Sequence, residues 1–336
     1  MAKTVIQEVL PAVLAEHRAI RAWQQLHPER PEPERIEIVT LKNKTAVYRL
    51  WGVRRDGGPV VAKRCDASSG HVERLVYEQL LPGVSAPTLR CFGWVPEPAG
   101  AFGWLFLEDA GAHAYSSASG ENRVLAGHWL AALHRTDLSP PLRAALPDRS
   151  PAHYLQRIRF CRAALRRRVD NPALSAQESE SLRTLVAWLD LMEARWPELQ
   201  RFFQTWPQAL VHGDFVVKNL RLRSAGAGAP ELLVFDWEMA GWGVPAVDLA
   251  QVGSGTANPD LETYAASVNG LLPRAPAGGL ERLAAFGSLL RLVDQISWEA
   301  LTMKGQSYRF LLKPLSTLQL YEPQLAAALR ALKWLP

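Results

Sequence analysis

A short stretch of the chain carries polar residues whose types and spacing could do chemistry. In LVHGDFVVKNLRL, which begins at Leu210, His212, Asp214 and Asn219 form the pattern HxDxxxxN. Phosphoryl transfer requires one group that accepts or orients the proton of the attacking hydroxyl and another that holds a metal ion on the phosphates. We therefore expect Asp214 to be the catalytic base and Asn219 to be a metal ligand.

A second carboxylate follows a short apolar run farther along the chain. Residues 232–235, LLVF, are typical of a buried strand, and Asp236 comes directly after them. A strand end can present a carboxylate to a hard divalent ion, so we expect Asp236 to be the second metal ligand. Each motif alone is weak evidence, because a His-Gly-Asp turn or an aspartate after a strand is often only a polar turn or a helix cap. Their order and spacing together favour a single phosphotransfer site.

These segments resemble the aminoglycoside phosphotransferase and choline kinase group, the small-molecule branch of the protein-kinase-like fold. The matching segments are LVHGDFVVKNL, LLVFDWEMAGWGVPAVDLA and LAALHR. The resemblance implies an α+β, bilobal fold with a small antiparallel-sheet N-lobe and a larger, mainly helical C-lobe. We expect an N-terminal helical extension and linker at 1–35, a nucleotide-binding N-lobe at 36–111 and a catalytic, substrate-binding C-lobe at 112–336.

The activity that the resemblance implies is that of a kinase. Such a kinase uses ATP or GTP, with Mg²⁺, and we expect this chain to transfer the γ-phosphate to a hydroxyl of a small molecule such as a natural product, an antibiotic or an amino alcohol. A serine/threonine protein kinase is disfavoured, because HGD replaces HRD and no APE segment follows FDWE. The alternative is a nucleotide-binding pseudokinase or regulatory scaffold, which predicts the loss of Lys63, Asp214, Asn219 or Asp236. All four residues are present.

Three strands and a helix should position the nucleotide lysine. The runs IEIVTL, AVYRLWGV and PVVAKRC alternate as antiparallel strands do, and Asp56-Gly57 is a hairpin signal. By the kinase template, Lys63 in the third strand contacts the nucleotide phosphates. Its partner should lie on the next helix. There Glu73 lies beside the expected buried stripe and Glu78 on the far side, so we expect Glu73 to be the partner.

The resemblance also assigns the adenine contact and the support of the catalytic loop. The adenine should meet the backbone of the hinge, formed by Phe106, Leu107, Glu108 and Asp109, although this segment could equally be a plain strand end. Two residues should support the loop structurally: His212 as a brace, and Asp248 through backbone amides. His134 should be a packing or capping residue. The hairpin LKNKT lacks the glycines of a kinase phosphate loop, so no residue there is assigned.

The acceptor is the least determined part. From residue 241 to 336 there are seven acidic and eight basic residues, whereas an enzyme for polycations should present an excess of carboxylates. Asp294 and Trp298 are four apart on an expected helix and could hold one amine. The alternative is that Asp294 pairs with Arg291 on the surface and Trp298 is core. We expect an acceptor with at most one or two cationic groups.

The composition is that of an ordinary globular protein. The chain has 336 residues, 48% hydrophobic and 21% charged, with three scattered cysteines. The N-terminus carries acidic residues where a signal peptide would be apolar, so we expect a cytoplasmic protein without a membrane partner. The net charge of +5 is densest in RIRFCRAALRRR, which has helical periodicity, and no nucleic-acid motif accompanies it. We expect no nucleic-acid partner and leave the oligomeric state open.

Overall fold

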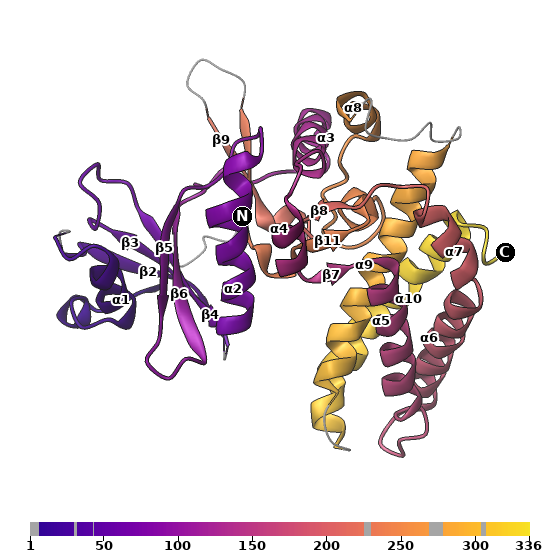
Figure 1. Cartoon of the computed structure of the whole chain (residues 1–336). Helices are drawn as coiled ribbons and strands as arrows, with labels where there is room; N and C mark the ends of the chain where they lie inside the picture. The colour runs from indigo at the N-terminus through magenta and orange to yellow at the C-terminus, as the bar shows by residue number, and fades with distance from the viewer. Residues whose placement is uncertain (1–6, 30–31, 43, 225–229, 269–277, 304–306) are drawn as a thin grey trace. The chain divides into compact units, whose positions relative to one another are not determined.

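The computed structural model describes residues 7–29, 32–42, 44–224, 230–268, 278–303 and 307–336 (Figure 1). The chain forms two compact units. Unit 1 comprises Met1–Ala114 and Asn219–Ala240, and unit 2 comprises Tyr115–Lys218 and Gly241–Pro336. The chain therefore passes from one unit to the other inside the HxDxxxxN segment. The lobe boundaries that we expected at residues 35 and 111 stay a prediction.

Unit 1 is built on a six-stranded antiparallel sheet in the order β1-β2-β3-β4-β6-β5. Its strands are β1 (Gln7–Glu8), β2 (Arg35–Leu41), β3 (Ala46–Trp51), β4 (Val60–Asp66), β5 (Cys91–Pro96) and β6 (Phe102–Glu108). The three strands expected after residue 35 are present as β2, β3 and β4. Gly57, in the turn between β3 and β4, has a φ of +75°, which glycine adopts without a steric penalty.

Helix α1 (Arg18–Leu26) covers one face of this sheet. Its residues Ile20 and Trp23 join a core cluster with Val60, Ala62 and Phe106 from the strands. We expected the N-terminal extension, within residues 1–35, to be helical up to its linker. Residues 4–6 lie outside the described residues, a 3₁₀ turn η1 spans Pro11–Val13, and residues 7–8 form β1 instead of helix. The edge of β2 offers backbone groups to these two residues, and this pairing prevails over the local helical pattern.

Helix α2 (Ala67–Leu75) follows β4 directly. Asp66 caps it by accepting a hydrogen bond from the amide of Ser69 at 3.1 Å. The helix continues as a π-helical turn η2 (Val76–Leu80) and a 3₁₀ turn η3 (Leu81–Gly83), and it contacts β4, β5 and β6. Because alternate residues of β4 point to opposite faces, Lys63 faces α2 while Val60 and Ala62 face α1.

A two-stranded hairpin completes unit 1. Strand β9 (Leu220–Arg223) pairs antiparallel with β10 (Glu231–Val234), and the turn between them includes residues 225–229, which lie outside the described residues. A 3₁₀ turn, η5 (Trp237–Met239), follows β10 and contacts α2. The hairpin thus brings the residues just before β9 and just after β10 to the same end.

Unit 2 is mainly helical. Its helices are α3 (Gly120–His134), α4 (Pro140–Ala145), α5 (Pro151–Arg166), α6 (Ala176–Ala194), α7 (Trp196–Phe203), α8 (Leu261–Ser267), α9 (Gly279–Thr302) and α10 (Tyr308–Ala331). Helix α5 packs against α6 and α9, and α9 against α10 (Figure 1). Arginines of the basic run in α5 form ion pairs with Asp190 and Glu193 of α6.

A small sheet in unit 2 includes the strand that directly precedes His212 and Asp214. Strand β11 (Gly241–Gly243) lies between β7 (Asp148–Arg149) and β8 (Ala209–Val211). The 3₁₀ turns η4 (Val217–Asn219) and η6 (Pro245–Leu249) follow β8 and β11. No helix within the described residues combines the length and apolar character needed to cross a membrane.

Candidate active site

In unit 1, a buried lysine lies between two carboxylates. Lys63 donates from Nζ to Oε1 of Glu73 at 2.6 Å and to Oδ1 of Asp236 at 2.5 Å. Glu73 is completely buried on α2, whereas Glu78 is exposed and pairs with Arg74 one turn away. A residue on β4, one on α2 and one after β10 therefore meet at this point.

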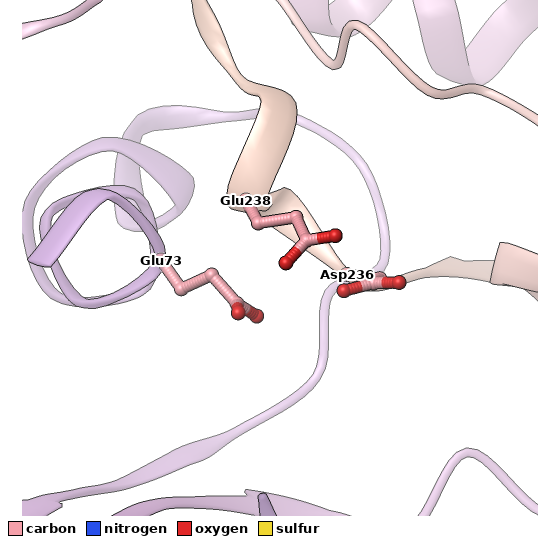
Figure 2. A group of neighbouring side chains, drawn as sticks. All are labelled: Glu73, Asp236 and Glu238. Atoms are coloured by element: carbon pink, nitrogen blue, oxygen red, sulfur yellow. The ribbon is translucent and has the colours of Figure 1, made fainter. Parts of the chain in front are cut away.

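A third carboxylate joins this cluster. Glu238, in η5, lies near Glu73 and Asp236, and one oxygen from each of the three lies within 4.8 Å of the others. Figure 2 shows the three carboxylates directed toward one another, with Glu73 coming from the helix and the other two from the segment after β10. Glu73 is buried, Asp236 half-buried and Glu238 exposed, so the cluster reaches from the interior to the surface.

The charges in this cluster depend on one another. Burial opposes the charge of Lys63, but Glu73 and Asp236 outweigh it and raise the pKa of Lys63 well above its usual value. Burial raises the pKa of Glu73, and the nearby charges of Asp236 and Glu238 raise it further, against the effect of Lys63. Lys63 therefore keeps its positive charge and pairs with both Glu73 and Asp236.

Asp236 has an unusual backbone conformation. Its φ of 71° and ψ of 65° lie in the left-handed region, which costs a residue with a Cβ about 1–3 kcal/mol and is most frequent at functional sites. Asn219, which precedes β9 at the same end of the hairpin, is buried, and its main-chain carbonyl oxygen accepts a hydrogen bond from the amide of Phe235 at 3.1 Å. This bond keeps the main chain of Asn219 beside the residue that precedes Asp236.

The donor set of unit 1 fits a hard divalent cation. Mg²⁺ prefers carboxylate and amide oxygens, and it is usually bound through one or two carboxylates together with phosphate and water. Asp236 and Glu238 supply carboxylates on the accessible side of the cluster, whereas Glu73 is completely buried. Asp236 and Glu238 are thus the best placed carboxylates for such an ion.

The hinge segment offers main-chain groups only. The side chains of Phe106 and Leu107 are buried in unit 1, and Phe106 belongs to the core beneath α1. Asp109 forms an ion pair with Arg49, and its Oδ1 accepts a hydrogen bond from the amide of Gly111 at 2.8 Å. Glu108 forms an ion pair with Arg223 at 3.1 Å. Any adenine contact by this segment would therefore involve its backbone.

In unit 2, a buried aspartate organises the loop that carries Asp214. Asp248 accepts hydrogen bonds from the amides of His212 at 2.7 Å and Gly213 at 2.9 Å. Gly213 has a φ of +80°, which allows the chain to turn here without the strain that a Cβ would cause. The imidazole Nδ1 of His212 in turn accepts from the amide of Asp214 at 3.2 Å. The loop is therefore held through its own backbone.

His134 extends this support to the helices. Its Nε2 lies 3.2 Å from Oδ2 of Asp248, and its Nδ1 lies 3.0 Å from the hydroxyl of Tyr264. The residue at the end of α3 thus connects the loop support to α8. Asp248 is buried and satisfied by three donors or polar neighbours, which is the condition for keeping a buried carboxylate stable.

Asp214 is held by two cations. Arg291 of α9 donates from Nη1 to its Oδ1 at 2.7 Å, and Lys218 lies with Nζ 3.1 Å from its Oδ2. Burial alone would raise the pKa of this carboxyl, but the charges of Arg291 and Lys218 outweigh it and hold the pKa below its usual value. Asp214 is therefore ionised at neutral pH and fixed in position.

Asp294 and Trp298 differ in their exposure to solvent. Asp294 is buried, whereas Trp298, one turn along α9, is 36% exposed. Both carboxylate oxygens of Asp294 are closed to solvent and have no hydrogen-bond partner among the described residues. The Nε atom of Arg157 lies 3.9 Å from Oδ1 of Asp294. The alternative that placed Asp294 on the surface and Trp298 in the core was therefore wrong.

Burial raises the pKa of Asp294 to about 6, although Arg149, Arg157 and Arg291 all favour its charged form. The same surroundings, burial first and then Arg149 and Arg157, lower the pKa of His153 to about 4. Asp294 is therefore influenced by three arginines and by a second buried carboxylate, that of Asp214.

Two residues of the site were missed in the sequence. Glu238 follows Asp236 by two positions, and the pattern DxE after a buried strand could have indicated it. Arg291 was considered as a basic residue and as an alternative partner of Asp294, and no local pattern connects it with Asp214, 77 positions earlier.

Comparison with known proteins places this site in a family. The profile of the phosphotransferase enzyme family matches residues 46–286. No curated protein matches the sequence. Among solved structures, the GDP complex of wild-type aminoglycoside 2'-phosphotransferase-IIIa has a TM-score of 0.64 at 13% identity, over 90% of this chain and 97% of that one.

Two further structures show the same fold. Spectinomycin phosphotransferase in complex with ADP and spectinomycin has a TM-score of 0.60 at 10% identity, covering 90% of this chain and 94% of that chain. An ethanolamine kinase from Plasmodium vivax has a TM-score of 0.58 at 13% identity, covering 87% and 83%. The chain belongs to the phosphotransferase enzyme family. The expected protein-kinase-like fold and the interpretation as a small-molecule kinase are thereby confirmed.

Proposed function

We propose that this enzyme transfers the γ-phosphate of ATP or GTP, in the presence of Mg²⁺, to a hydroxyl of a small molecule that carries little positive charge. The observation that carries the proposal is the cluster of Lys63 with Glu73 and Asp236 in a chain that also retains an ionised Asp214. A permanent cation fixed by a buried carboxylate is suited to hold phosphate oxygens.

The metal ligands in this proposal are Asp236 and Asn219, with Glu238 as an additional carboxylate. A bound Mg²⁺ would neutralise charge on the phosphates and orient the γ-phosphate. Asp236 is also the ion-pair partner of Lys63, so the same carboxylate would face both the metal and the lysine. The strained backbone of Asp236 supports this role, because such strain is retained mainly where function requires it.

The acceptor hydroxyl would donate its hydrogen bond to Asp214. Since Arg291 and Lys218 lower the pKa of Asp214, this carboxylate is a weak base, and its main contribution would be to orient the hydroxyl. It would take up the proton as the bond from the hydroxyl oxygen to the γ-phosphorus forms, while the bond from the γ-phosphorus to the β–γ bridging oxygen breaks and the nucleoside diphosphate leaves. Arg291 would keep one oxygen of Asp214 occupied and so leave the other for the substrate and Lys218.

The charge of unit 2 supports an acceptor with few cationic groups. Arg149, Arg157 and Arg291 act on Asp294, whose own carboxylate oxygens are closed to solvent. The neighbouring carboxylate of Asp214 is already paired with Arg291 and Lys218. A polycation would bring several ammonium groups out of water without partners. Holding an amine at Asp294 and Trp298 would require this buried carboxylate to become accessible. Among the structural neighbours are enzymes named for aminoglycosides, spectinomycin and ethanolamine, and complexes with GDP and with ADP.

The proposal is tested by an acceptor panel. Purified enzyme with Mg²⁺ and either ATP or GTP is incubated with mono-amines, neutral polyols, macrolides and kanamycin-like polycations, and the products are analysed by mass spectrometry. We expect one phosphoryl group on an acceptor with at most two cationic groups. Nucleotide binding without any phosphorylated product across the panel would favour the pseudokinase alternative, and efficient turnover of polycations alone would contradict the acceptor class.

The metal assignment has its own test. Asp236→Ala should abolish the Mg²⁺-dependent part of nucleotide binding, because a hard divalent ion loses its anionic ligand. Calorimetry with and without Mg²⁺ measures this, and Glu78→Ala, an exposed carboxylate in the same unit, is the control. Wild-type Mg²⁺-nucleotide affinity in Asp236→Ala would show that the metal is held elsewhere.

A further inference from the structure

A second concave site lies in unit 1, on the face of the sheet that α1 covers. It is a cavity of about 170 Å³ with walls from α1, from the turn between β3 and β4, and from β5. Trp23, which lines it, belongs to the same core cluster as Val60 and Ala62, whereas Lys63 points to the opposite face of β4. The cavity is therefore separate from the carboxylate cluster of Figure 2.

Aromatic rings form part of the walls. The rings of Trp23 and Phe92 meet edge to face with centroids 5.7 Å apart, and the ring of His27 lies 4.2 Å from that of Trp23. Trp23 is 2% exposed, and its indole Nε1 has no hydrogen-bond partner among the described residues. A buried N–H donor without a partner costs stability and is normally satisfied by another group.

Arginines supply the remaining polar groups. The guanidinium carbons of Arg54 and Arg90 each lie 5.1 Å from the centroid of Phe92, and Arg55 completes the set. Arg54 is paired with Asp56, the single carboxylate of the lining. Within the described part of the chain, Arg55 and Arg90 form no ion pair. The cavity therefore presents unpaired positive charge and hydrogen-bond donors beside aromatic surface.

We propose that this cavity binds a small aromatic anion, that is, a planar ring that carries a phosphate or carboxylate group. The guanidinium groups of Arg55 and Arg90 pair with the oxyanion, since guanidinium matches phosphate and carboxylate geometry. The ring of the ligand lies against Phe92 and Trp23. The position of the cavity, with Trp23 in contact with Phe106 of the hinge strand at a centroid distance of 5.3 Å, makes this ligand a candidate effector of the enzyme.

Binding is measured by calorimetric titration of the full chain with phenyl phosphate and with benzoate, at low ionic strength and with saturating Mg²⁺-nucleotide to fill the kinase site. Phenol and benzylamine are the uncharged and cationic controls. We expect one or both anions to bind and neither control to do so. Binding of phenyl phosphate alone would identify the group as phosphate, and binding of benzoate as carboxylate.

Three variants locate the site. Arg55→Gln and Arg90→Gln should each weaken anion binding by roughly tenfold or more, as expected for the loss of a charge-assisted hydrogen bond. Arg35→Gln is the matched control, because Arg35 stacks on Trp51 of the same sheet but does not line the cavity. Arg55 is exposed, so its replacement leaves the fold intact. The proposal is overturned if the anions bind no better than phenol, or if Arg55→Gln and Arg90→Gln bind them as the wild type does.

Discussion

At the scale of single residues, the environment of Asp214 decides what this carboxylate can do. Its two cationic partners differ in exposure: the side chain of Arg291 is 8% exposed and that of Lys218 is 66% exposed. A buried charge pair loses much more when one partner is removed than an exposed pair does. We therefore attribute the fixed position and the low pKa of Asp214 chiefly to Arg291.

This difference predicts a shift in pH dependence. In Arg291→Met, the pKa of Asp214 should rise, because burial then acts with less opposition. Activity that requires the ionised carboxylate is then lost at a higher pH, so the acidic limb of kcat/KM against pH moves upward. Lys218→Met is the exposed control and should move it less, and less still at high salt. Identical acidic limbs in the wild type and Arg291→Met would refute the role of Arg291.

The sequence predicts a site residue when a pattern within a few positions of that residue identifies it. The hydrophobic period of the helix after β4 separates Glu73 from Glu78, and the short motifs indicate Asp214, Asn219 and Asp236. These signals lie within a few residues of the group that they identify. The contact of Arg291 with Asp214 depends on the packing of α9 against the loop, so no local pattern could reveal it.

At the scale of elements, the face of α2 determines which glutamate reaches Lys63. Glu73→Gln should weaken nucleotide binding, because Lys63 loses the buried anion that fixes its position. Glu78→Gln is the matched control, since it changes the same residue type on the exposed side and removes only a surface pair. Calorimetry of both variants measures the effect. Equal losses, or a loss confined to Glu78→Gln, would contradict the assignment.

The contact between α9 and η6 requires a glycine at position 287. A Cβ built at Gly287 would lie 1.7 Å from the carbonyl oxygen of Ala246, so the two elements touch through backbone. Gly287→Ala should lower the free energy of unfolding by about 1–3 kcal/mol, the usual cost of overpacking. Because η6 also carries Asp248, kcat should fall as well.

Gly120→Ala is the control for this change. A Cβ at Gly120, in the first turn of α3, would meet no heavy atom within 4 Å, so its stability should be unchanged or slightly raised. Chemical denaturation measures both variants. A Gly287→Ala protein as stable as Gly120→Ala would show that α9 and η6 can separate without cost.

Contacts between residues far apart in the sequence also explain why some helices and strands differ from what the local sequence pattern predicts. Residues 7–8 join the sheet because β2 has an open edge, and α1 docks by Ile20 and Trp23 on a face built by strands that follow it in the chain. Helical periodicity in α1 predicts its apolar side. It contains no information about which surface this side will contact, and for that reason the cavity beside α1 was not expected.

At the scale of the whole molecule, the residues of the proposed reaction are divided between the two units. Lys63, Glu73, Asn219 and Asp236 belong to unit 1, and Asp214 with its supports belongs to unit 2. The short motif HxDxxxxN therefore contributes to both. We therefore expect substitutions in unit 1 to change nucleotide binding, and substitution of Asp214 to change transfer to the acceptor. Mutagenesis can measure these two properties independently.

The most direct test of the account is therefore a comparison of Asp214→Asn with the wild type for an acceptor that the enzyme phosphorylates. Turnover and Mg²⁺-nucleotide affinity are measured on the same preparations. The account predicts a turnover lower by roughly a hundredfold or more with nearly unchanged nucleotide affinity, because Asp214 orients and deprotonates the acceptor and does not hold the nucleotide. Wild-type turnover in Asp214→Asn would contradict it, and so would a loss of activity explained entirely by lost nucleotide binding.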